Sequence, residues 1–229
     1  GWVPHAQALE THRHRLPNGL RVVVAEQKTV PIVAINCLID GGARIDPRSQ
    51  PGLASFTADL LDEGTRDATG PEIAREIDSL GGSLYVGASQ DWTLASASLL
   101  ARDFRTGLKL VANSLRFPTF PADEIERVRR ETLGAIQASD ENPASVASRT
   151  FRAALFGDTP YGHPIIGSPE AVRGFTRSDV VKFHQKNLKP DKTICAIVGD
   201  ISPEIALAAV KEFLGDWSGV AAEHGARLP

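Results

Sequence analysis

The order of strand-like and helix-like segments is the feature that most restricts how this chain of 229 residues can fold. Runs of strands followed by runs of helices are typical of an α+β domain, whereas a parallel βαβ sheet would alternate the two. We therefore expect one α+β domain with a mostly antiparallel sheet, covered by helices mainly on one face. The strand-like runs are residues 8–15, 20–24, 31–40, 83–89, 92–99 and 193–198. The helix-like runs are residues 52–63, 71–80, 101–116, 122–140, 144–156, 178–187 and 203–213.

Three local patterns support this order of elements. Asn18-Gly19 between two β-rich runs predicts a hairpin, because both residues tolerate positive φ. Residues 31–40 are apolar almost throughout, which predicts a strand buried on both faces. Thr69 and Glu72 have the spacing of a capping box at the start of the second helix.

Composition excludes several classes of protein. The chain is 42% hydrophobic and 23% charged with a formal net charge of -3, as in ordinary soluble domains. Its 25 basic residues are scattered, so nucleic acid is not an expected partner. No stretch approaches the roughly 20 apolar residues that span a bilayer. Cys37 and Cys195 each lie in an apolar run, where they could be buried thiols or form a disulfide.

The segment from Gly52 to Thr65, GLASFTADLLDEGT, carries the most information about function. It resembles the signature G-L-A-H-F-L-E-H-M-L-F-K-G-T of the pitrilysin family of metallopeptidases, which includes mitochondrial processing peptidase and insulin-degrading enzyme. In that family the two histidines bind zinc and the glutamate is the general base. Ser55 and Asp59 occupy the histidine positions here, and Ala58 occupies the glutamate position.

The resemblance extends over nearly the whole chain. It includes residues 16–20, 81–89, 161–167 and 189–200. In the family, residues 81–89 would form the edge strand with which substrates pair, so the resemblance implies substrate contacts along that strand. The implied residues are Tyr85, Val86, Gly87 and Ala88, although Tyr85 replaces an asparagine that is frequent in the family.

The third zinc ligand of the family is a glutamate on the long helix, and its position corresponds to Ala135. A shift of one residue would offer Gly134 or Ile136, and neither is a ligand. Glu131, one turn away, could be a displaced remnant. A catalytic zinc needs three protein ligands, so we expect no metal site and no cofactor in this chain. Zinc is expected only in an active partner.

These residues lead to three hypotheses. The first is a non-catalytic subunit or domain, inactive on its own, that supports peptide binding and enclosure by an active partner with an intact HxxEH motif. Residues 1–229 would then be one half of a longer two-domain polypeptide. The second is a structural or assembly module without a peptidase role. The third is a hydrolase with a rearranged metal site. The compartment stays open between a bacterial cell envelope or periplasm and the cytoplasm.

Two groups of polar residues have competing interpretations. Asp59, Asp62 and Glu63 could bind a hard metal ion, but a solvated helix face balanced by Arg or Lys is the simpler interpretation. His184 lies on an amphipathic helix near basic residues, which predicts a surface position.

Overall fold

The computed structural model describes residues 9–219 and contains a mixed sheet with the order β1-β2-β6-β3-β5-β4. Neighbouring strands are antiparallel except β2 and β6, which are parallel. The predicted α+β architecture is confirmed, and only the start of the first strand, at residue 8, lies outside the described residues. The strands are β1 His12–Arg15, β2 Arg21–Glu26, β3 Ile32–Asp40, β4 Ser83–Ala88, β5 Trp92–Leu100 and β6 Thr193–Gly199.

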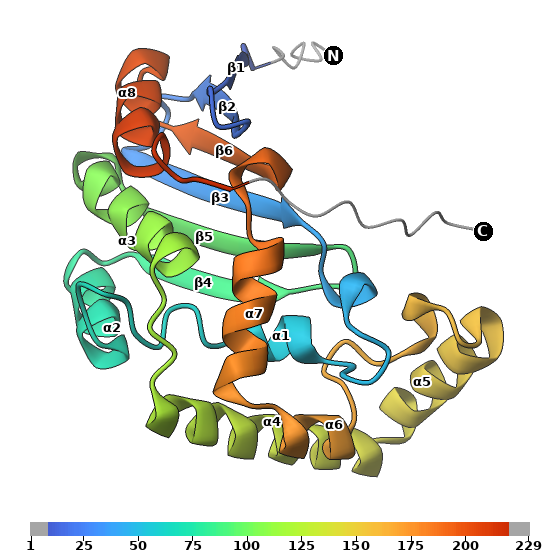
Figure 1. The fold of residues 1–229 in the computed structure, drawn as a ribbon. Helices are drawn as coiled ribbons and strands as arrows, with labels where there is room; N and C mark the ends of the chain where they lie inside the picture. Colours follow the sequence, from blue (N-terminus) through green and yellow to red (C-terminus); the bar gives the residue numbers. More distant parts are fainter. Residues whose placement is uncertain (1–8, 220–229) are drawn as a thin grey trace.

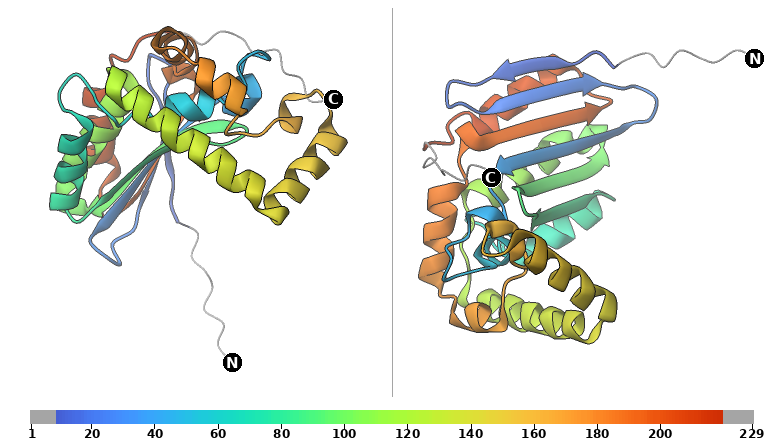
Figure 2. Two further views of the ribbon diagram at one scale, coloured as in Figure 1. Left: turned by 90° about the horizontal axis from the view of Figure 1, so that it is seen from below. Right: turned by 90° about the vertical axis from the view of Figure 1, so that its right-hand side faces the viewer.

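The helices gather on one side of the sheet and beyond one of its edges. Helices α3 and α8 lie in front of the strands in Figure 1, and α1 and α4 lie below the β4 edge. Figure 2 shows α4 and α5 extending away from that edge. The helices are α1 Leu53–Ala58, α2 Gly70–Ser79, α3 Phe104–Arg116, α4 Ala122–Glu141, α5 Pro143–Phe156, α6 Pro169–Gly174, α7 Arg177–Asn187 and α8 Pro203–Leu214. The sequence pattern did not predict the short α6.

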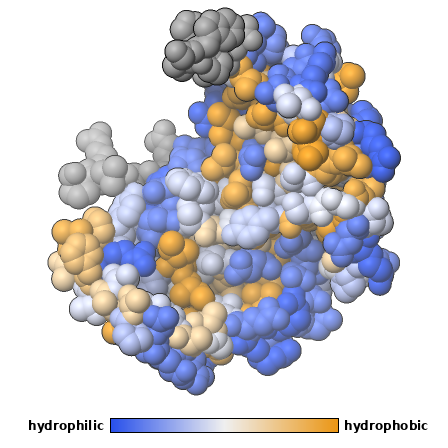
Figure 3. Space-filling model, turned by 180° about the vertical axis from the view of Figure 1, so that it is seen from behind, coloured by the Kyte–Doolittle hydropathy of each residue, from blue (hydrophilic) through white to orange (hydrophobic). Residues whose placement is uncertain are grey.

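The core lies between the sheet and the helices, so only one face of each strand is fully buried. In β3, Val33, Ile35 and Ile39 are buried, whereas the alternate residue Leu38 is only half-buried. The prediction that this strand is buried on both faces was wrong, because no helix within residues 9–219 covers the second face. Apolar side chains nevertheless line that open face, as Figure 3 shows from behind, and Val198 on β6 is 40% exposed.

The first hairpin is confirmed, but its turn differs from the expected one. Gly19 has a φ of 91°, whereas Asn18 does not adopt positive φ. The Gly19 N–H donates to the Leu16 carbonyl and the Leu16 N–H to the Leu20 carbonyl, which makes a three-residue loop. The Asn18 amide donates instead to the Leu214 and Trp217 carbonyls and so ties the turn to the end of α8.

A disulfide between Cys37 and Cys195 joins β3 to β6. The two residues are directly opposite each other in the antiparallel ladder, and neither is exposed. The structure thus selects the disulfide from the two alternatives that the sequence left open. Within the described residues, no helix combines the length and the apolar character needed to cross a bilayer.

Candidate site at the altered zinc motif

Helix α1 carries the altered motif and is shorter than predicted. It ends at Ala58 and not at Glu63, and Asp59 is its C-cap, with the Asp59 N–H donating to the Ser55 carbonyl at 2.9 Å. Hydrogen bonds to the third preceding residue follow, from the Leu60 N–H to the Thr57 carbonyl at 3.2 Å and from the Leu61 N–H to the Ala58 carbonyl at 3.1 Å. Leu60 and Leu61 are both completely buried. After Ala58 the chain continues as a turn, and both leucines pack into the core.

The start of α1 is fixed by contacts with two other segments. The Asp46 carboxylate accepts hydrogen bonds from the N–H groups of Gly52 at 2.7 Å and Ala54 at 2.8 Å. Burial raises the pKa of Asp46 to about 7, although these two bonds oppose the rise. Gly52 has a φ of 95°, and a Cβ there would stand 2.6 Å from the Gly167 Cα. The backbone of the loop before α6 therefore lies directly against the first residue of the motif.

We expect Gly52→Ala to lower the free energy of unfolding by about 2 kcal/mol, because the new methyl group meets rigid backbone at positive φ. Gly134→Ala is the matched control. Gly134 lies in exposed helix, and a methyl group there would have no atom within 4 Å, so alanine should stabilise by about 0.5–1 kcal/mol. Urea unfolding of both variants measures the difference. If Gly52→Ala were as stable as Gly134→Ala, the backbone in contact with Gly52 would not be rigid.

A pocket of about 370 Å³ lies between the end of α1, strand β4 and helix α4. Of the motif and edge-strand positions that the family resemblance identified, it brings together Asp59, Ala135, Tyr85 and Val86. It does not bring in the others: Ser55 and Ala58 on α1, and Gly87 and Ala88 on β4. Its lining is Asp59, Asp62, Glu63, Leu84, Tyr85, Val86, Val128, Glu131, Thr132, Ala135 and Ile166.

The side chains at the motif positions do not form a zinc site. Ala58 is 1% exposed and belongs to the core, Ser55 is half-buried outside the pocket, and Ala135 has no ligand atom. Asp59 is therefore the one motif position in the pocket with a metal-binding group, and a catalytic zinc needs three. In residues 9–219 the structure also groups no three His, Cys, Asp or Glu side chains that could hold a metal ion.

Arg127 on α4 pairs with two of the carboxylates that line the pocket, and the sequence interpretation missed it. Its guanidinium forms ion pairs with Glu63 at 2.6 Å, Glu124 at 2.5 Å and Glu131 at 2.9 Å. The spacing of Arg127 and Glu131, four residues apart on a helix, was the available signal. Glu131 is thus held by Arg127, and Glu63 is balanced by an arginine, as the simpler interpretation of the acidic cluster supposed.

Two carboxyl groups of the pocket are harder to ionise than usual. Burial among protein atoms raises the pKa of Asp59 to about 6, and the nearby acids Asp62, Glu63 and Glu131 add to the rise, although part of Asp59 stays open to solvent. Burial also raises the pKa of Asp62 to about 6, with Glu63 raising it and Arg127 opposing. Because acidic groups outnumber basic ones in this pocket, it favours either a proton or another cation.

The raised pKa values predict how stability changes with pH. The folded chain keeps protons on Asp62 up to about pH 6, whereas the unfolded chain releases them near the ordinary value of 3.8. The Asp62 carboxyl group therefore makes its full contribution to the stability of the fold below about pH 4, and this contribution is lost as the pH rises through 6. We expect Asp62→Asn to be more stable than wild type at pH 7 by about 1 kcal/mol, allowing for solvent screening, and equal at pH 4. Urea unfolding at both pH values tests this, and a constant difference would contradict it.

Strand β4 forms the other wall of the pocket and is an edge strand, since β5 is its one partner in the described sheet. The Ser89 N–H donates to the Trp92 carbonyl, and groups facing a partner strand alternate along an antiparallel ladder. The main-chain groups of Leu84 and Val86 therefore point outward, toward the pocket that these residues line. Tyr85 is 58% exposed, and its ring lies over the α-carbon of Gly87.

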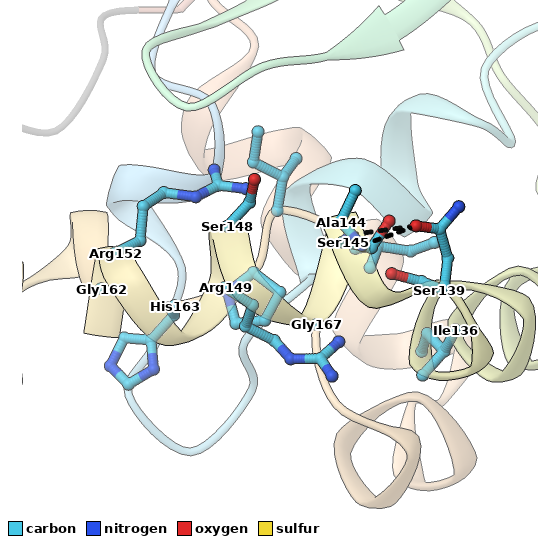
Figure 4. Close-up of a pocket in the computed structure, with 14 residues that line it drawn as sticks. Ile136, Ser139, Ala144, Ser145, Ser148, Arg149, Arg152, Gly162, His163 and Gly167 are labelled. Carbon is cyan, nitrogen blue, oxygen red and sulfur yellow. Dashed lines mark hydrogen bonds between the residues drawn. The ribbon is translucent and has the colours of Figure 1, made fainter. Parts of the chain in front are cut away.

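A larger pocket of about 500 Å³ lies between helix α5 and the loop at residues 162–167. Arg149, Arg152 and His163 line it, but Arg149 forms an ion pair with Asp140 at 2.7 Å. Figure 4 shows that the side chains of Arg149 and Arg152 extend in different directions. This pocket therefore does not assemble its charged groups around one point.

His184 does not have the surface position that the sequence predicted. Its ring is half-buried, with Nε2 at 2.8 Å from the Leu115 carbonyl and an edge contact with Phe120. Burial lowers the pKa of this imidazole. The physical reason is that the Leu115 carbonyl, in the last turn of α3, lies within hydrogen-bond reach of the ring, so His184 links α7 to α3. It is not among the residues that line the altered motif pocket.

The fold and the altered motif together define a metallopeptidase-type α+β module without the zinc-binding and base side chains. The family model described as "Insulinase (Peptidase family M16)" matches residues 21–169, and the model described as "Peptidase M16 inactive domain" matches residues 174–229. The chain belongs to peptidase family M16, the family suggested by the pitrilysin resemblance.

Three relatives illustrate the range of this family. An uncharacterised zinc protease of Mycobacterium leprae is 32% identical over 203 residues, covering 89% of this chain and 46% of the relative. Subunit 1 of the mitochondrial cytochrome b-c1 complex of Bos taurus is 26% identical, covering 96% and 46%. The crystal structure of a peptidase M16 inactive domain from Pseudomonas fluorescens has a TM-score of 0.88 at 27% identity, covering 94% and 53%. The chain thus spans about half the length of these relatives.

Proposed function

We propose that this chain is the non-catalytic half of an M16 peptidase assembly. Its partner would be a subunit or second domain that carries an intact HxxEH motif, and the chain would help to bind and enclose peptides. The observation that carries this proposal is that the chain lacks the catalytic side chains of the family but has its fold. Ser55, Ala58, Asp59 and Ala135 lack the expected chemistry, while the sheet, the edge strand and the position of α1 are kept.

Two features of the surface support this role. The outer edge of β4 offers main-chain groups at Leu84 and Val86 that pair with no strand within residues 9–219, and an extended peptide can add to such an edge as a further strand. The open face of the sheet carries half-exposed apolar residues such as Leu38 and Val198, which a second M16 half could cover. The chain spans about half the length of its relatives, so a partner half is the proposed occupant of this face.

The proposed compartment is an oxidising one. Disulfides persist mainly in periplasmic, secreted and extracellular proteins, and the Cys37–Cys195 bridge fits that setting. Among the compartments that the sequence left open, this supports the bacterial cell envelope.

Reconstitution tests the assisted-peptidase role. The chain is purified from its native host with a tag, and any co-purifying M16 protein with an intact HxxEH motif is expressed separately. We expect that partner to cleave an unfolded protein substrate faster when this chain is added. Recovery of the chain in a stable complex that contains no HxxEH protein would overturn the proposal.

A structural or assembly module is the second candidate function. The relative in the cytochrome b-c1 complex favours it, because that protein is named as a subunit of a respiratory complex. Under this alternative, the chain would co-purify with non-peptidase subunits, and its addition would not change any peptidase rate.

A further inference from the structure

Helix α5 contains no buried residue, whereas every other α-helix within residues 9–219 contains at least one. It contacts α4, which precedes it, and the short turn at Pro160–Gly162, where the Phe156 ring lies beside Tyr161. A helix of 14 residues is marginal in water by itself and gains most of its stability when one face packs against another element. The described chain gives α5 no such buried face.

The polar and apolar sides of α5 are reversed relative to those of an ordinary surface helix. Both of its charged side chains, Arg149 and Arg152, line the pocket of about 500 Å³ that α5 forms with the loop at residues 162–167. Phe151 and Leu155 do not line this pocket, and they are 66% and 60% exposed. An ordinary surface helix turns its apolar side toward the protein and its charges toward water. The outward side of α5 therefore has the composition of a surface that is covered.

The outward apolar residues also have the spacing of a helix that packs against a second surface. Ala147, Phe151, Ala154 and Leu155 recur at i, i+4, i+7 and i+8, which places them on one stripe. We call these four residues the outward stripe. The alanines leave notches between the two large side chains, and side chains of a second surface can pack into such notches. The stripe contains no charged residue, so the surface that covers it is apolar as well.

The size of the outward stripe indicates what kind of body covers it. Helix α5 has 14 residues, so the stripe is about 21 Å long and about 10 Å wide, on the order of 200 Å². A stable interface buries roughly 800 Å² on each partner, so a second α5 helix packed against this stripe would not suffice. The apolar open face of the sheet is visible in the same view as α5, which lies at the lower left of Figure 3. One large partner can contact both surfaces.

We infer that the outward stripe of α5 is a docking surface for the partner half proposed above, and that an apolar surface of that half packs against Phe151 and Leu155. The inference rests on the proposed function, and it adds the element of this chain that holds the partner. The chain spans about half the length of its relatives, so the other half is a body of the size that can cover α5 and the open sheet face together.

A lipid surface is the competing occupant of an exposed apolar helix. Interfacial helices lie on anionic membranes with lysine and arginine on their polar side. In this chain both arginines of α5 line the pocket, and Arg149 is paired with Asp140. Two exposed acids, Glu141 just before α5 and Asp158 just after it, would be repelled by anionic headgroups. The charges around α5 therefore favour a protein partner.

Calorimetric titration of the chain with the HxxEH-bearing M16 protein from the reconstitution described above tests the inference. We expect Phe151→Ser with Leu155→Ser to weaken binding at least about tenfold, because two large apolar side chains are no longer buried. Ala147→Glu should weaken binding as well, since it puts a charge into the stripe while keeping a good helix former. Ile205→Ser is the matched control. Ile205 is 54% exposed on α8, in front of the sheet in Figure 1, and its replacement should leave the affinity unchanged.

The possible results distinguish this inference from the function on which it rests. Wild-type affinity in both stripe variants would overturn the docking assignment and leave the proposed assembly intact. If no HxxEH-bearing protein binds the chain, the proposed function fails and the inference falls with it. Self-association in sedimentation velocity, or binding to phosphatidylglycerol vesicles, that disappears in the double variant would assign the stripe to a second copy or to lipid and overturn the inference. Circular dichroism of each variant confirms that it is folded.

Discussion

Replacing Cys37 and Cys195 together by alanine is expected to lower the free energy of unfolding by about 4–5 kcal/mol. The bridge joins residues separated by 158 positions in the sequence, so it restricts a large part of the unfolded chain. The entropy lost by the unfolded state grows with the size of the closed loop, and the folded state keeps its β3–β6 ladder in either form. Urea unfolding of the oxidised wild type and of the variant measures the difference.

A second measurement separates the bridge from the packing of its sulfur atoms. Both cysteines are completely buried, so alanine also leaves a small cavity. Unfolding in the presence of a reductant, after equilibration in denaturant, gives the stability of the wild type with two thiols. We expect most of the difference between wild type and variant to vanish under these conditions. A difference that is the same with and without reductant would attribute the effect to packing and not to the bridge.

Local signals in the sequence predicted most of the elements of the fold. The capping box of Thr69 and Glu72 is present, with the Thr69 N–H donating to the Glu72 carboxylate at 2.8 Å. The apolar periodicity placed α8 and β5 within one or two residues of their observed bounds. These signals depend on neighbours within four residues, so they can be read from one chain.

The predictions that were wrong depend on contacts between distant segments. The alternation of buried and half-buried residues in β3 follows from which sheet face the helices cover. His184 is fixed by the Leu115 carbonyl, which lies 69 residues away in sequence. The parallel pairing of β2 with β6 likewise joins the two ends of the chain. No pattern within a short window contains this information.

The candidate site was predictable only in part, for the same reason. The family resemblance identified Asp59, Ala135, Tyr85 and Val86, and the structure places all four at one pocket. The resemblance could not identify Arg127, because its partners Glu63 and Glu124 come from different segments of the chain. The part of the site that departs from the family is therefore visible only in the folded chain.

Restoring three ligands should give the chain a zinc site. Ser55→His, Asp59→His and Ala135→Glu together are expected to bind Zn²⁺ with a Kd tighter than about 1 µM, since three protein ligands suffice for a catalytic site. Ser55 and Asp59 are still one helical turn apart, joined by the Asp59 N–H to Ser55 carbonyl bond of 2.9 Å. Ala135 and Asp59 line one pocket, so the new side chains can converge. Ala58 is left unchanged, because it is 1% exposed and a glutamate there would bury an unpaired charge.

The position of the third ligand provides the control for this design. Gly134→Glu, combined with the same two histidines, places the carboxylate about 100° away around α4, because adjacent helical residues point in different directions. We expect this variant to bind Zn²⁺ at least about tenfold more weakly than the variant with Glu at position 135, because it lacks one of the three ligands. Competition with a chromogenic chelator measures both affinities. Equal binding by the two variants would refute the assignment of Ala135 to the third ligand position. Absence of binding in both would mean that α1 and α4 no longer hold the geometry of a metal site, so that this half of the family fold has lost its scaffold for zinc as well as its ligands.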